Sequence, residues 1–161
     1  MKKLLFIAIC CLILCGCEKK ENKPDTNKNL TKEQIVEKLM ETNNWLTSIW
    51  NDGICEISHY IGSGTNSIGQ TADIDFILQN FNNQYNEKAK YTDFINSLNT
   101  EEYITIQDTF NKAIEQSDII IKKVNAETPK AKTKVDYQKN IDLFNQYQSA
   151  FYDKVTELYY K

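Results

Sequence analysis

One short segment of the chain holds the residues with the clearest chemical potential. Cys55, Glu56 and His59 fall within five positions, and on a helix His59 shares a face with both of the others. An inward-facing Glu-x-x-His pair is the unit that di-iron helical bundles use twice. His59 is the only histidine in the chain, so a second such unit cannot form. A metal site at these three residues stays open, but we favour an ordinary helix surface and expect no cofactor.

The same residues could in principle serve catalysis, with the Cys55 thiol as nucleophile and His59 as its base. Such a pair also needs a third residue that orients the base and donors that stabilise an oxyanion. Neither is evident, and the sequence has no HExxH, GxSxG, P-loop or CxxCH motif. We therefore expect a protein that is not an enzyme.

A second group of candidate residues is a cluster of lysines around the turn between the third and fourth predicted helices. The cluster consists of Lys122, Lys123, Lys130, Lys132 and Lys134. Lysines in a last helical turn complement the helix dipole, and a solvated surface is one interpretation. The alternative is a contact site for an anionic partner. A net charge of −3 argues against a general nucleic-acid-binding protein.

The amino terminus has the features of a signal sequence. Lys2 and Lys3 precede an apolar run over 4–15, which is shorter than the roughly 20 residues of a membrane-spanning helix. The run ends in Leu14-Cys15-Gly16-Cys17, which resembles the lipobox of bacterial lipoproteins. The resemblance implies cleavage after Gly16 and attachment of lipid (diacylglycerol, with palmitate-like chains) to Cys17. It also implies an extracytoplasmic location, on the outer leaflet of the cell membrane or in an outer membrane. An uncleaved anchor or an ordinary secretory signal is the alternative.

These features predict three parts: a signal peptide over 1–16, a lipidated cysteine with a disordered tether over 17–29, and a helical domain over 30–161. Residues 18–29 contain no hydrophobic side chain, as is typical of disordered segments. Cleavage and lipidation leave Cys55 as the one free cysteine, so no intramolecular disulfide can form. The domain must be stabilised by its core.

From Leu30 onward the spacing of apolar residues is helical. The first predicted helix starts with a capping box at Thr31 and Gln34 and runs to about Ile61, with a possible kink or break at Asp52-Gly53. A loop over 62–69 follows. The second helix spans about 71–98 with a weak stretch over 86–90, the third starts at 99–100, and the fourth starts at Thr128-Pro129. The expected fold is all-α: an antiparallel up-down four-helix bundle with long helices.

The aromatic residues raise one further question. Trp45 and Trp50 are expected in the core or covering a loop. Tyr152, Tyr159 and Tyr160 lie near the end to which the tether attaches, where such amphipathic rings could dock at a lipid interface. We favour packing in or at the edge of the core for these three tyrosines.

The helical region resembles small, uncharacterised lipoproteins of Gram-positive bacteria. The residues that carry the resemblance are Trp50-Asn-Asp-Gly-Ile54, the following Gly/Ser loop, Asp75-Phe76 and the apolar stripe over 144–159. It implies no activity, so no functional residue follows from it. The function expected is a membrane-anchored, non-catalytic binding module with an envelope protein as possible partner and its oligomeric state open. A phage- or host-encoded exclusion or inhibitor lipoprotein, or a metal- or cofactor-binding bundle, are the alternatives.

Overall fold

The computed structural model describes residues 30–160, and this part of the chain is all-helical. The elements are α1 (Lys32–Ile49), η1 (Trp50–Ile54), α2 (Cys55–Ser63), α3 (Ile74–Tyr85), α4 (Lys88–Asn96), η2 (Glu101–Tyr103), α5 (Ile104–Ala126) and α6 (Gln138–Tyr159). Within the described range the only β-type pairing is an isolated bridge between Thr65 and Thr71. The predicted all-α class is confirmed. The predicted signal peptide, Cys17 and the tether lie outside the described residues.

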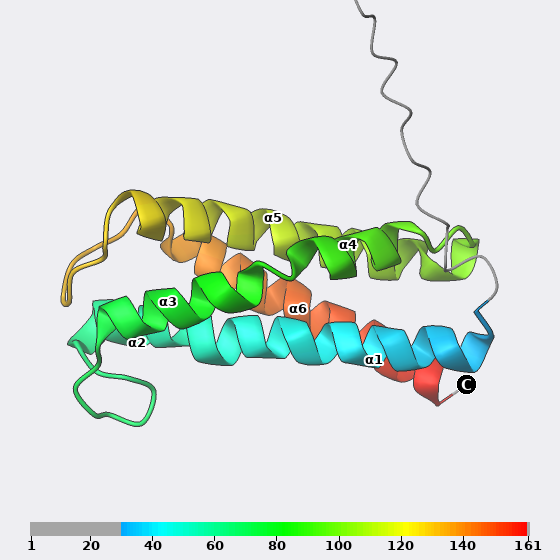
Figure 1. Ribbon diagram of the computed structural model, residues 1–161, viewed down its shortest axis with the longest axis horizontal. Coiled ribbons are helices and arrows are strands. Elements are labelled where there is room, and N and C mark those ends of the chain that lie inside the picture. Colours follow the sequence, from blue (N-terminus) through cyan, green and yellow to red (C-terminus); the bar gives the residue numbers. More distant parts are fainter. Residues whose placement is uncertain (1–29, 161) are drawn as a thin grey trace, which may run out of the picture.

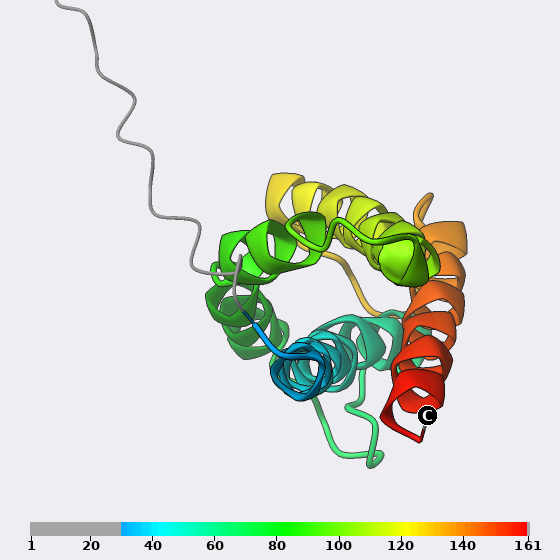
Figure 2. The same ribbon diagram turned by 90° about the vertical axis from the view of Figure 1, so that its right-hand side faces the viewer.

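The helices lie side by side along one long axis (Figure 1). The rod of α1, η1 and α2 runs in one direction, α3 and α4 return, α5 runs back beside them, and α6 returns to the carboxyl end. Figure 2, along that axis, shows these segments surrounding a common centre. One end of the fold holds the start of α1 and the end of α6, and we call it the terminal end. The other holds the segments 64–73 and 127–137, and we call it the loop end.

Aromatic and aliphatic side chains from several helices fill the centre. The largest fully buried side chains include Phe81 of α3, Phe110 of α5, and Phe144 and Phe151 of α6. Trp45 of α1 is buried as predicted and stacks on a tyrosine of α4, with 4.6 Å between ring centroids. These contacts join helices that are distant in sequence.

The first helix begins as its sequence predicts. Thr31 and Gln34 form a reciprocal capping box: the Gln34 N–H donates to Thr31 Oγ1 at 3.3 Å, and the Thr31 N–H donates to Gln34 Oε1 at 2.9 Å. Two backbone donors that the first turn leaves free are thereby satisfied. Of the apolar stripe that the helical spacing predicts here, Leu39, Leu46 and Ile49 are fully buried, and Ile35 at its start is partly buried.

The expected kink or break at Asp52-Gly53 is instead a short π-helical segment inside a continuous rod. The π segment, Trp50–Ile54, joins α1 to α2 without interruption. Gly53 is buried in it, and a Cβ at this position would lie 2.6 Å from Phe81 Cδ2. Glycine is therefore present because α3 packs its Phe81 ring directly against this backbone.

The predicted start of the fourth helix at Thr128-Pro129 is wrong. Helix α6 begins at Gln138, and residues 127–137 form an irregular segment. Pro129 is buried, Lys132 adopts a left-handed backbone with φ of 60°, and its N–H donates to the carbonyl of Ile61 at 2.6 Å. This bond to the end of α2 holds the segment across the loop end. A threonine-proline pair is a local helix-start signal, and here the tertiary contact prevailed.

The described helices include none that is both long enough and apolar enough to cross a lipid bilayer.

Candidate functional site

Helix α2 brings Cys55, Glu56 and His59 onto one short segment, but it does not assemble them into a site. The Glu56 carboxylate turns to the following loop, where it accepts hydrogen bonds from the Ser67 N–H, at 3.0 Å, and from the Ser67 hydroxyl. His59 is exposed to solvent. Glu56 thus holds the segment 64–73 in place, a role that the sequence analysis did not predict.

The thiol of Cys55 is in a setting that does not activate it. The side chain is half-buried, and burial, with the nearby Glu56 carboxylate, raises the pKa of the Cys55 thiol above its usual range. The thiolate is the form that attacks electrophiles and binds metals, so a raised pKa disfavours both. Among residues 30–160, no group of three or more His, Cys, Asp or Glu side chains is arranged to hold a metal ion.

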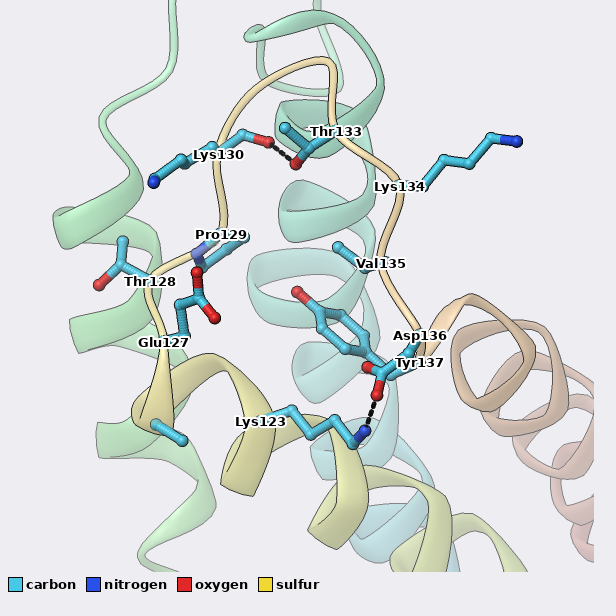
Figure 3. A pocket seen from close by; sticks show the side chains of 11 residues that line it. Lys123, Glu127, Thr128, Pro129, Lys130, Thr133, Lys134, Val135, Asp136 and Tyr137 are labelled. Carbon is cyan, nitrogen blue, oxygen red and sulfur yellow. Dashed lines mark hydrogen bonds and ion pairs between the residues drawn. The ribbon is translucent and has the colours of Figure 1, made fainter.

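A pocket lined by three of the five predicted lysines lies at the loop end. It has a volume of 710 Å³ and is lined by the last turns of α5 and by the segment 127–137 (Figure 3). Three of the five predicted lysines line it: Lys123, Lys130 and Lys134. Lys132 and Lys134 line an adjoining pocket of 660 Å³ that reaches the end of α2. Lys122 is exposed near the end of α5 and lines neither. The structure therefore gathers four of these lysines around one loop.

The charges of this pocket are only partly paired. Lys123 forms an ion pair with Asp136 across the base of the pocket, as the dashed line in Figure 3 shows. Lys130 and Lys134 make no ion pair with any residue in the described part of the chain, and their ammonium groups point outward from opposite sides of the loop in Figure 3. Glu127 is the remaining acidic residue of the lining. The rim of the pocket is thus modestly positive.

Tyr137 is the residue of this pocket that sequence reasoning missed. It is only 5% exposed, and its hydroxyl is buried without a hydrogen-bond partner in the described chain. Burial, with smaller contributions from Asp136 and Glu127, raises the pKa of Tyr137 to about 12. A tyrosine beside a helix start is usually a packing residue, and nothing in the sequence pattern distinguishes an unpartnered hydroxyl.

The loop that carries the pocket is held by backbone contacts. The Thr133 hydroxyl donates to the Lys130 carbonyl at 2.6 Å, in addition to the bond from Lys132 to Ile61. Helix α6 begins directly after Tyr137 without a side-chain cap and without an acidic residue in its first turn. Asp136, directly before the N-cap Tyr137, is the acidic residue nearest in sequence to this helix start.

The terminal end carries the three tyrosines, and none of them lies in the core, one of the two positions that we favoured; packing at the edge of the core stays a prediction. Tyr152, Tyr159 and Tyr160 are 48%, 61% and 80% exposed. Their positions lie on the outer side of the α6 stripe, whose core-facing members are Phe151, Val155 and Leu158. An apolar groove of 490 Å³ lies beside Tyr159, between α6 and the first turns of α1.

Comparison with known proteins finds no matching family model, no similar curated protein and no similar solved structure.

Proposed function

We propose that this chain is a cell-envelope lipoprotein that acts as a membrane-anchored, non-catalytic binding module. The lipobox-like sequence over 14–17 supports lipid attachment at Cys17 and an extracytoplasmic location. In this proposal the helices form an antiparallel up-down four-helix bundle that stands on the lipid through residues 18–29.

The observation that carries the proposal is the position of the lysine-lined pocket. The chain enters the fold at the terminal end, next to the start of α1, and the pocket lies at the opposite end (Figure 1). A protein tethered at its terminal end would present the loop end to other molecules. We infer that the loop end is the contact surface and that an envelope component binds there.

A binding role is better supported than catalysis by the state of the candidate catalytic groups. The Glu56 carboxylate is engaged by Ser67, and the Cys55 thiol has a raised pKa. The loop-end pocket offers ammonium groups and a phenol hydroxyl, which are binding groups.

Site-specific photo-cross-linking in intact cells tests the proposal. A photo-reactive amino acid at Lys130 should capture a discrete partner, whereas the same amino acid at Lys32, an exposed lysine of the terminal end, should not. Equal capture at both positions, or no capture at Lys130, would count against a contact surface at the loop end.

A further inference from the structure

We propose that the loop-end pocket binds a phosphate ester, with Lys130 and Lys134 supplying positive charge and the Tyr137 hydroxyl donating a hydrogen bond. The inference rests on the proposed function, in which the loop end is the contact surface. It adds the chemical class of the ligand and the residue that recognises it.

The Tyr137 hydroxyl is the first argument. A buried hydroxyl without a partner is unfavourable, and phenylalanine would fill the same space without that cost. In Figure 3 the hydroxyl points away from the start of α6, into the space that the loop encloses. A phenol keeps its proton at neutral pH, so the Tyr137 hydroxyl can donate; burial raises its pKa to about 12 and extends this to alkaline pH. An anionic oxygen is the partner that a free donor in this position favours.

The charge balance is the second argument. The ion pair of Lys123 with Asp136 is internally neutral, so Lys130 and Lys134 face only Glu127 among the lining side chains. The lysines stand at the rim, on long flexible side chains that can turn toward a bound anion. The pocket is therefore suited to a ligand with at least one negative charge.

The number of acceptor oxygens favours phosphate over carboxylate. The chain has no arginine, so its cations are lysines, which cannot form the planar fork that matches either group. Lysine acts as a point charge and is a common phosphate ligand. A phosphate ester offers more acceptor oxygens than a carboxylate does, enough for several ammonium groups and a phenol together. The volume of 710 Å³ leaves room for the alcohol part of the ester.

The length of the fold bears on the source of the ester. The continuous rod from Lys32 to Ser63 is about 45–50 Å long at ~1.5 Å per residue. In the proposed orientation, with Cys17 in the lipid and the terminal end toward it, the loop end stands about that far from the anchoring membrane. We therefore assign the site to a soluble or polymeric phosphate ester rather than to the headgroups of that bilayer.

Calorimetric titration of the full-length chain in detergent micelles tests the inference. The probes are glycerol 3-phosphate and, as a dianion without phosphate, succinate. We expect glycerol 3-phosphate to bind at least tenfold more tightly than succinate. Tyr137→Phe should weaken its binding roughly tenfold or more, as is typical when a hydrogen bond to a charged group is lost. Tyr152→Phe, which removes the hydroxyl of an exposed tyrosine in α6, is the matched control and should change nothing.

The lysines are tested by the double substitution Lys130→Gln and Lys134→Gln, which should weaken binding and reduce its dependence on salt. Lys154→Gln at the terminal end is the control. Thermal unfolding of each variant without ligand verifies the fold, and Tyr137→Phe should unfold at no lower temperature than the parent protein.

The inference is overturned if succinate binds as tightly as glycerol 3-phosphate, if Tyr137→Phe binds normally, or if only phosphatidylglycerol vesicles bind. Cross-linking at Lys130 without phosphate binding would remove this inference and leave the proposed function standing. Phosphate binding without cross-linking would count against the proposed function and leave the phosphate site standing.

Discussion

Helix propensity and core packing predict opposite changes in stability when Gly53 is replaced by alanine. In a helix interior alanine is more favourable than glycine by about 1 kcal/mol, so propensity alone predicts that Gly53→Ala stabilises the protein. The structure predicts the opposite sign. A Cβ on Gly53 would lie 2.6 Å from Cδ2, 3.0 Å from Cγ and 3.3 Å from Cβ of Phe81. Phe81 is fully buried, so its ring has no solvent-facing space into which to move.

The expected size of the effect follows from these two opposing contributions. Forcing an extra carbon into a well-packed core costs about 1–3 kcal/mol, and contact with three atoms of one ring places this case in the upper half of that range. Subtracting the propensity gain of about 1 kcal/mol leaves a net loss of about 1–2 kcal/mol in the free energy of unfolding. For a folded region of this size, that loss lowers the melting temperature by roughly 4–8 °C.

Urea denaturation followed by far-ultraviolet circular dichroism measures the change. Gly62→Ala is the matched control: it also lies in the rod, in α2, but a Cβ there meets no atom within 4 Å. It should stabilise the protein by about 0.5–1 kcal/mol. In a Phe81→Leu background the cost of Gly53→Ala should shrink, because the smaller side chain relieves the contact. If Gly53→Ala raises stability as Gly62→Ala does, the close packing of Phe81 on the π segment is refuted.

Four further predictions concern other parts of the molecule. Cys17→Ala should release the protein from membranes or leave an unprocessed precursor, seen by fractionation and gel mobility; unchanged processing and retention would contradict lipidation. Glu56→Ala should speed proteolytic cleavage between residues 64 and 73 while global stability changes by less than about 1 kcal/mol, since the bonds to Ser67 are exposed; equal cleavage rates would show that Glu56 does not hold the loop. Zinc should leave the melting temperature unchanged, and a zinc-induced rise that His59→Ala abolishes would establish a metal site. The pKa of Tyr137 is raised from about 10 to about 12, so the stability that its protonated form contributes is complete below pH 10 and is lost as the pH rises toward 12. Tyr137→Phe should remove that part of the alkaline unfolding. An identical alkaline transition in the variant would contradict the burial of the phenol.

The helices themselves could be predicted from sequence because their signals are local. The capping box at Thr31 and Gln34 and the buried stripe of α1 were both foreseen, and both are confirmed. The weak stretch predicted over 86–90 coincides with the short break between α3 and α4. In each case the signal for the helix or its end comes from residues three and four positions apart, and the tertiary contacts favour the same structure.

The errors occurred where distant residues decide the outcome. The segment 127–137 carries a helix-start signal, but a backbone bond from Lys132 to Ile61, far away in sequence, holds it as a loop. Tyrosine is a residue type that often packs in a core, and only the orientation of α6 on its neighbours shows that these three tyrosines face solvent. Glu56 was considered as a metal ligand, but its carboxylate binds Ser67, which lies in the loop that follows α2.

The sequence by itself determined that the described chain is helical, where most helices lie, which side of α1 is buried, and that a cluster of lysines surrounds one connection. These properties follow from the 3.6-residue period and from capping, which act over single turns. Only the tertiary structure decided that Gly53 makes room for Phe81, that the lysines surround a pocket, and that Tyr137 brings an unpartnered hydroxyl into it. Those features depend on how helices far apart in the chain pack together, and local periodicity carries no information about that packing.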